Sequence, residues 1–304
     1  GVTPPARDDA PETPRGTLSD AERAELLDRA YSALDGLMGQ QAAAEQVETR
    51  IFEPIRAAAE AGGPALGTRA PALIALVSGP AGVGLREAAF AIAHGVAGLG
   101  ALDRAHIAEL RPRDARTDAA EAATRKAEEA RGGVLMLTDA DWMLAADPYG
   151  GATAPGVEAG LAVLDVAEAD PGRVLIVATL PEGADEKLRA DAGHRRWLDR
   201  LAIRSIRLQR LEEDDLLAVL RRELEALGAT LDPDAERSAR SLLREVSDAE
   251  GAAFDNAEAC RRLAEQISAA ETEIALEGGL GPAEPGARRR VTRDHVLRAQ
   301  ETWE

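Results

Sequence analysis

Residues 73–87 read LIALVSGPAGVGLRE, an apolar run followed by a glycine-rich turn and the start of a helical pattern. The run 73–77 is apolar without alternation, as expected of a strand whose sheet is covered on both faces. Gly79, Gly82 and Gly84 stand where a G-x-x-x-x-G-K-[S/T] loop places backbone N–H groups around a phosphate. The stretch therefore predicts a strand, a phosphate-binding type of loop and a helix at the centre of an α/β fold.

Two positions of this loop that normally carry its chemistry hold other residue types. Leu85 stands at the lysine position, and Arg86 stands at the Ser/Thr position. A leucine cannot donate hydrogen bonds to phosphate oxygens, and an arginine cannot ligate Mg²⁺ as a hydroxyl does. We therefore expect weak nucleotide binding or none, with any binding carried by the backbone of residues 82–84 and the following helix N-terminus.

Length and charge limit the classes of function. The 304 residues suit one large α/β domain with an appendage, or two domains. Because only 3% of residues are aromatic, the core must be built from Ala, Leu, Val and Ile. A net charge of −18 opposes binding to nucleic acid or to an anionic membrane, since both need a positive field. A basic or neutral protein partner is the better expectation.

Cysteine usage and hydropathy favour a cytoplasmic protein. Cys260 is the single cysteine, which excludes an internal disulfide framework and suits a reducing compartment. It lies in a helical pattern, where a small buried hydrophobic role is favoured over that of a nucleophile. No apolar run approaches the length of about 18 residues that a membrane span needs. The four histidines show no ligand spacing with one another or with Cys260, so no metal site is expected.

Strands and helices alternate along the first two thirds of the chain, which predicts a parallel, three-layer α/β sheet. The expected strands are residues 73–77, 107–110, 133–138, 174–179 and 202–208. The expected helices of this part are residues 17–33, 34–63, 87–98, 118–131 and 156–169. From residue 212 onward the strand signal disappears, and helices are expected at residues 213–227, 233–246, 257–276 and 292–303. The predicted organisation is a flexible lead at 1–16, an α/β core at 17–210 and an all-α lid at 211–304.

An α/β nucleotide-binding core followed by a small helical lid resembles the layout of AAA+ ATPases. The local sequence is most similar to the subfamily of the red-type Rubisco activase CbbX, the sporulation protein SpoVK and the type VII secretion protein EccA. The likeness runs from about residue 34 to the C-terminus and rests on residues 34–39, 79–86, 132–144, 174–179, 194–201, 211–217 and 254–263. It implies a P-loop NTPase core whose nucleotide contacts would include Met38, Gly79, Gly82, Val83, Gly84, Leu85 and Arg86.

The resemblance also implies which residues would be catalytic, and there the sequence departs from the family. Thr138 replaces the aspartate that organises Mg²⁺, and Asp139 replaces the glutamate that activates water with a carboxylate one methylene shorter. Leu198 replaces the first arginine of the family's F-R-S-R turn, which reaches the neighbouring subunit's nucleotide, while Arg200 matches the second. Glu258 stands where the family has a lid arginine that touches the γ-phosphate, so the charge is reversed.

Two further segments bear on these departures. Arg195 or Arg196 could reach across to a neighbouring subunit in place of Leu198, although a solvated basic turn is the simpler interpretation. Residues 111–123 lack the tyrosine between glycines that forms the family's pore loop. An aromatic side chain is what grips a threaded peptide, so threading is not expected here.

Two functions are consistent with the sequence. The first is a catalytically degenerate AAA+ module that needs no cofactor and acts as a scaffold or regulatory partner of a catalytically intact AAA+ protein or domain. Its charge of −18 and the lack of a bridging ATP predict a monomer or weak dimer in isolation. The alternative is a weakly active, ATP-dependent and Mg²⁺-dependent remodelling ATPase that has moved its catalytic groups onto Arg86 and Asp139.

Overall fold

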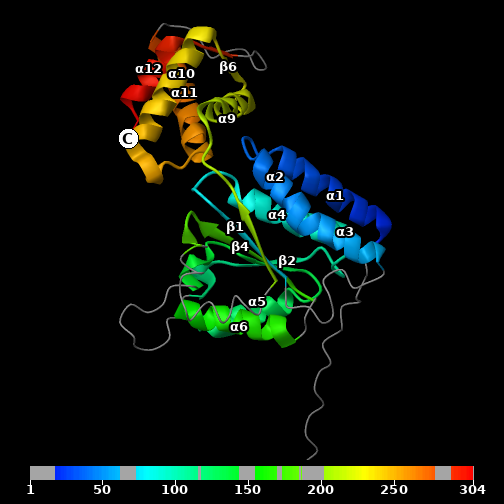
Figure 1. The fold of residues 1–304 in the computed structure, drawn as a ribbon. Helices are drawn as coiled ribbons and strands as arrows, with labels where there is room; N and C mark the ends of the chain where they lie inside the picture. The colour runs from blue at the N-terminus through cyan, green and yellow to red at the C-terminus, as the bar shows by residue number, and fades with distance from the viewer. Residues whose placement is uncertain are drawn as a thin grey trace, which may run out of the picture.

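The computed structural model describes residues 18–61, 73–115, 118–143, 155–169, 173–184, 186, 202–277 and 289–303. Within these residues, a five-stranded sheet lies between two layers of helices, and a smaller helical unit lies at one end of it (Figure 1). We call the first part the core and the second the lid. The predicted fold class, a P-loop NTPase type of α/β core followed by a helical lid, is confirmed.

The sheet of the core is parallel and has the strand order β2-β3-β4-β1-β5. Its strands are β1 (Leu73–Gly79), β2 (Ile107–Leu110), β3 (Val134–Leu137), β4 (Leu175–Pro181) and β5 (Ala202–Arg207). The chain leaves β1 for β2 at the far edge, and β3 and β4 then fill the space between them. In such open sheets, ligands bind beyond the carboxyl ends of the strands at the point where the order reverses. That point lies at the end of β1, where the glycine loop begins.

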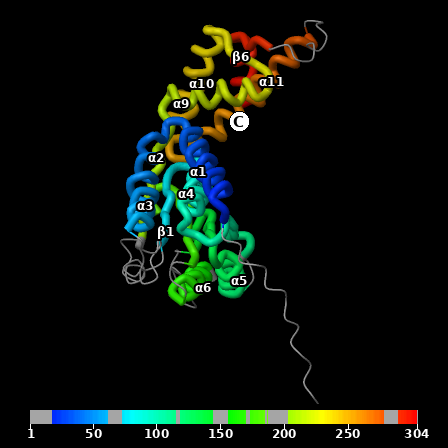
Figure 2. The backbone as a smooth tube through the Cα atoms, turned by 90° about the vertical axis from the view of Figure 1, so that its right-hand side faces the viewer, coloured from blue at the N-terminus to red at the C-terminus, as the bar shows by residue number. Residues whose placement is uncertain are grey.

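Each strand divides its side chains between two apolar clusters. In β1, Ala75 and Val77 belong to the cluster under α4 (Leu85–Gly98), while Ile74 and Leu76 belong to the opposite one. This alternation follows from the period of two residues along a strand. The opposite face is covered by α5 (Ala119–Glu129) and α6 (Pro155–Ala169), and Figure 2 shows both on the side of the sheet away from α4.

Small residues let helices approach closely on the α4 side. A Cβ at Gly98 would lie 2.7 Å from Leu27 of α1 (Asp20–Asp35), and Gly95 lies directly against the ring of Phe52. The single helix predicted for residues 34–63 is divided in the structure into α2 (Gln41–Val47), one π-helical turn (Glu48–Phe52) and α3 (Glu53–Glu60). The wider turn lies where Ile51 and Phe52 are buried against α4.

The lid contains the four predicted helices, α9 (Glu213–Ala226), α10 (Pro233–Glu250), α11 (Ala257–Glu277) and α12 (Arg293–Glu301). It also contains two short strands that the sequence did not predict, β6 (Ala229–Leu231) and β7 (Arg289–Val291), which pair in parallel. Three-residue strands are too short to show an alternating pattern, and here the partner segments are separated by two helices. The expected all-α composition of the lid is corrected in this detail.

Short 3₁₀ turns complete the described elements at Pro112–Ala115, Ala140–Met143 and Gly251–Ala253. Within the part of the chain that the structure describes, no helix is both long and apolar enough to cross a membrane. The predicted lead at residues 1–16 and the basic turn at 194–201 lie outside the described residues.

Candidate functional site

The glycine loop joins the end of β1 to the first turn of α4. Gly82 and Gly84 have φ values of +70° and +96°, a left-handed conformation that favours glycine. Gly79 is needed for a different reason, since a Cβ there would lie 2.8 Å from the carbonyl oxygen of Leu208. No side chain caps the N-terminus of α4, so its first backbone N–H groups keep the orientation that attracts anions. The geometry predicted for this loop is present.

A pocket of about 320 Å³ opens beside the loop, between the core and the lid. This volume lies at the small end of the range for ligand sites in proteins, roughly 300–1,000 Å³. It is lined by Gly36, Leu37, Met38, Gly82, Val83, Gly84, Glu87, Leu211, Val219, Arg222, Glu223, Ala257, Glu258 and Arg261. Four of the candidate contact residues, Met38 and residues 82–84, therefore lie together at one cavity, whereas Gly79, Leu85 and Arg86 do not line it.

The charges in this pocket do not favour a polyphosphate. Its three carboxylates outnumber its two guanidinium groups. Arg222 pairs with Glu223 at 3.0 Å, and Arg261 pairs with Glu258. No cation among the described residues pairs with Glu87, which lies in the first turn of α4. Leu85 packs against the apolar cluster of the core and so adds no positive charge at the lysine position.

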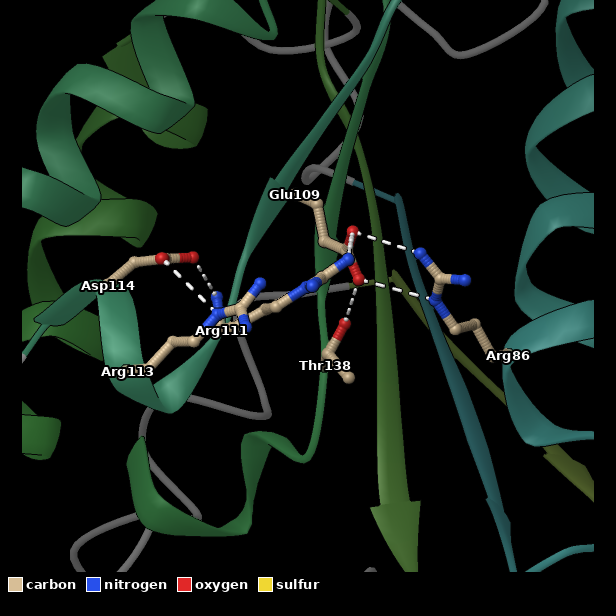
Figure 3. A network of polar contacts seen from close by, with 6 residues as sticks. All are labelled: Arg86, Glu109, Arg111, Arg113, Asp114 and Thr138. Carbon is tan, nitrogen blue, oxygen red and sulfur yellow. Dashed lines mark hydrogen bonds and ion pairs between the residues drawn. The ribbon is translucent and has the colours of Figure 1, made fainter. Parts of the chain in front are cut away.

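Arg86, at the position of the Mg²⁺-binding hydroxyl, is held by Glu109 of β2 (Figure 3). Its Nη2 and Nε lie 3.2 and 3.4 Å from the two carboxylate oxygens of Glu109, and its guanidinium lies 4.9 Å from the centre of the Phe90 ring. Glu109 reaches this side of the sheet because Ala108 and Leu110 point to the opposite cluster.

Two more groups complete the network around Glu109. Arg111, directly after β2, donates a hydrogen bond to Glu109 Oε2, and Thr138, directly after β3, donates one to Oε1 at 2.8 Å. The side chain of Glu109 is 18% exposed, while that of Arg86 is 51% exposed. Hydrogen bonding from Arg111, Arg86 and Thr138, with the Arg86 charge added, lowers the pKa of Glu109 to about 2. Glu109 is therefore an anion at neutral pH that accepts hydrogen bonds from Arg86 and Thr138, the two residues at the metal-binding positions.

Asp139 takes no part in this network. It is exposed, its backbone is left-handed with φ +50°, and its N–H donates to Thr179 Oγ1 at 3.0 Å. Leu198 and Arg200, like Arg195 and Arg196, lie outside the described residues. The structure thus brings together residues 86 and 138, places Glu258 at the pocket and leaves Asp139 separate.

Three polar residues at this site were not assigned a role from sequence. Glu109 is a carboxylate in an apolar strand, Thr179 is buried at the end of β4, and Asn256 is fully buried between loop and lid. Buried or half-buried polar groups need partners, so a glutamate in the run IAEL was the available signal for Glu109. Nothing in the local sequence indicates which distant groups Thr179 and Asn256 contact.

The residues present do not fit ATP with Mg²⁺. A hydroxyl and a carboxylate suit the ion, but positions 86 and 138 offer a guanidinium and a hydroxyl that are already hydrogen-bonded to Glu109. No cluster of three or more His, Cys, Asp or Glu side chains that could hold a metal ion occurs among the described residues.

Solved AAA domains are similar to this chain in structure. The FIGL-1 AAA domain in complex with ADP matches with a TM-score of 0.58 and 15% identity, covering 89% of this chain and 84% of that chain. The Thermotoga maritima RuvB Holliday junction branch migration motor matches with a TM-score of 0.54 and 16% identity, covering 88% and 70%. No protein-family model and no curated protein matches the sequence. The chain has the AAA+ fold, and identities this low show the fold alone.

Proposed function

We propose that this chain is a catalytically degenerate AAA+ module, a pseudo-ATPase that acts as a scaffold or regulatory partner in an assembly. The observation that carries the proposal is the network in which Glu109 binds both Arg86 and Thr138. In an active P-loop enzyme, these two positions hold a metal ion that neutralises developing charge. Here a guanidinium supplies a permanent positive charge, and the protein neutralises it with its own carboxylate.

Other features of the pocket support the loss of hydrolysis. Leu85 packs against the apolar cluster of the core and presents no ammonium group, and Glu258 places a carboxylate on the pocket wall. In related NTPases, loss of one arginine finger alone lowers the rate by roughly 10³ to 10⁵. Asp139, which the alternative function needs as a base, is exposed and is not among the residues that line the pocket.

The sequence likeness to CbbX, SpoVK and EccA is part of the same proposal. It suggests a chain that keeps the architecture of these proteins and works beside a catalytically intact AAA+ protein or domain. A closed ring relies on matching flanks between subunits. A net charge of −18 per copy makes a homomeric ring repel itself, whereas a partner of opposite or neutral charge meets no such barrier.

The experiment is a coupled ATPase assay on the purified chain with and without Mg²⁺. We expect no turnover above a protein-free blank. The matched positive variant carries Leu85→Lys, Arg86→Thr, Thr138→Asp and Asp139→Glu. Any Mg²⁺-dependent turnover gained by this variant would show that the residues at these four positions prevent ATP hydrolysis in the wild type. Wild-type turnover on the order of 1 s⁻¹, an ordinary enzyme rate, that is abolished by Asp139→Asn would refute the proposal and favour the remodelling ATPase.

A further inference from the structure

A second set of contacts joins the lid to the glycine loop through hydrogen bonds between protein groups. Its centre is Asn256, which is fully buried and has a left-handed backbone with φ +48°. Its Nδ2 donates to the carbonyl oxygens of Ala81 at 2.9 Å and Phe254 at 3.1 Å, and its Oδ1 accepts from the N–H of Leu211 at 3.1 Å. One side chain therefore connects the glycine loop, the linker after β5 and the start of the lid's third helix.

The backbone beside Asn256 touches the same loop. The N–H of Ala257 donates to the carbonyl oxygen of Gly82 at 3.1 Å. The carbonyl oxygen of Asp255 lies so close to Gly82 that a Cβ on that residue would overlap it. Consecutive carbonyl groups of the loop, those of residues 81 and 82, are thus both hydrogen-bonded by the lid.

Side chains of the lid hold this segment in place. The carboxylate of Asp255 receives two hydrogen bonds from Arg262, at 2.5 and 3.2 Å, and the Arg262 guanidinium lies 5.7 Å from the centre of the Trp303 ring. Phe254 is fully buried in an apolar cluster that continues from the α4 side of the core into the lid. Residues 254–257 are therefore held by side chains of the lid and are hydrogen-bonded to the glycine loop.

We propose that residues 254–257 form a latch that fixes the lid on the glycine loop without nucleotide. Separating lid from loop would break the hydrogen bonds to the carbonyl oxygens of Ala81 and Gly82, and the buried amide of Asn256 would lose its partner in the loop. The orientation of the lid is then a property of the chain itself and does not respond to ATP or ADP. This inference goes beyond the proposed function, because a latched lid and a lost ATPase activity can each be true without the other.

The first test uses the isosteric variant Asn256→Asp. The new carboxylate oxygen would face the carbonyl oxygens of Ala81 and Phe254, so two hydrogen bonds become repulsive contacts, while Leu211 keeps its acceptor. We expect hydrogen exchange of the Ala257 amide, whose N–H donates to the carbonyl oxygen of Gly82, to accelerate by about tenfold or more. The matched control is Gln40→Glu, which alters a buried amide whose hydrogen bonds, among the described residues, go to the backbone of Gln209. Equal acceleration in both variants would mean a general loss of stability and would overturn the latch.

The second test uses a pair of glycines with similar backbone strain. Gly82→Ala places a methyl group against Asp255, whereas Gly228→Ala, at φ +75°, meets no atom within 4 Å. Only the first substitution should release the lid. Release is measured as the distance between spin labels introduced by Glu121→Cys in α5 and Ser241→Cys in α10, both at exposed positions.

The reactivity of the native Cys260 thiol distinguishes release of the lid as a unit from unfolding of the lid. Cys260 is buried and donates to the carbonyl oxygen of Leu216 within the lid, and burial raises its pKa to about 12. It should stay unreactive toward a thiol reagent in all these variants if the lid moves as a unit. We expect one narrow label distance in the wild type, unchanged by ATP or ADP, and a broader distribution in Asn256→Asp and Gly82→Ala. A wild-type distance that shifts with nucleotide, or variants that keep the wild-type distance, would overturn the proposal.

Discussion

Replacing Glu109 by glutamine tests whether the Arg86–Glu109–Thr138 network stabilises the core. The change keeps the shape of the side chain and removes its charge, which leaves Arg86 and Arg111 facing an amide. A pKa lowered from 4.5 to about 2 corresponds to a ceiling of about 3 kcal/mol in the free energy of unfolding at pH 7. Because Arg86 is half exposed, solvent screening reduces its share, and we expect a loss of about 2–3 kcal/mol.

The stabilisation that Glu109 contributes should decrease as the pH is lowered. The folded-state pKa of Glu109 is lowered, so its stabilisation is fully present above pH 4.5 and is lost as the pH falls toward 2. Urea denaturation of the wild type and of Glu109→Gln should therefore differ most at neutral pH. Between pH 7 and pH 3 the gap should shrink by about half or more, because the wild-type carboxylate gradually loses its advantage.

The control is Glu25→Gln, which removes a carboxylate whose only described ion pair, with Arg29 on the same helix, is 64% and 60% exposed. An exposed pair of this kind contributes about 0.5 kcal/mol or less. If Glu109→Gln destabilises the protein no more than Glu25→Gln does, the network is a surface contact. The argument that it replaces a metal site would then be refuted.

Two further predictions concern ligand and assembly. In isothermal titration calorimetry, the wild type should bind ATP with an affinity weaker than low-micromolar, and a low-micromolar affinity would contradict this. The double variant Leu85→Lys with Arg86→Thr should bind ATP more tightly, because the ammonium group restores a positive charge at the loop. In light scattering at physiological salt, the isolated chain should be a monomer or weak dimer because its charge of −18 opposes self-association, and a stable hexamer without nucleotide would show that its interfaces are self-sufficient.

Much of the fold could be predicted because local patterns agree with the tertiary structure. The run at residues 73–77 lies within β1, which ends at Gly79, while Gly82 and Gly84 lie in the turn after it, and β2 occupies residues 107–110 as predicted. Each of the four lid helices lies within a few residues of its predicted bounds. These elements have periodic apolar residues or turn residues whose conformational preferences act over short distances.

The rest depended on contacts between distant segments. The sequence does not indicate a role for Glu109, because its partners Arg86 and Thr138 come from other elements and only the strand order brings them together. Asn256 gives no local sign of its role, because its contacts with Ala81 and Leu211 depend on how the lid meets the core. The residue types missing from the loop can be read from the sequence, whereas the network that replaces them is visible only in the structure.

The parallel pairing of β6 with β7 sets the order in which the lid can be completed. Thr230 follows α9, whereas its partner Arg290 comes after α11 and just before α12. Val291 and Val296 are buried in the same cluster as α9 and α11, so a nascent chain ending before residue 289 leaves apolar surface uncovered. Pairings between remote segments form late, because the intervening loop must close first. On the ribosome, the sheet of the core can close once β5 has emerged. The lid, by contrast, exposes apolar surface of the kind that chaperones bind until α12 has been made.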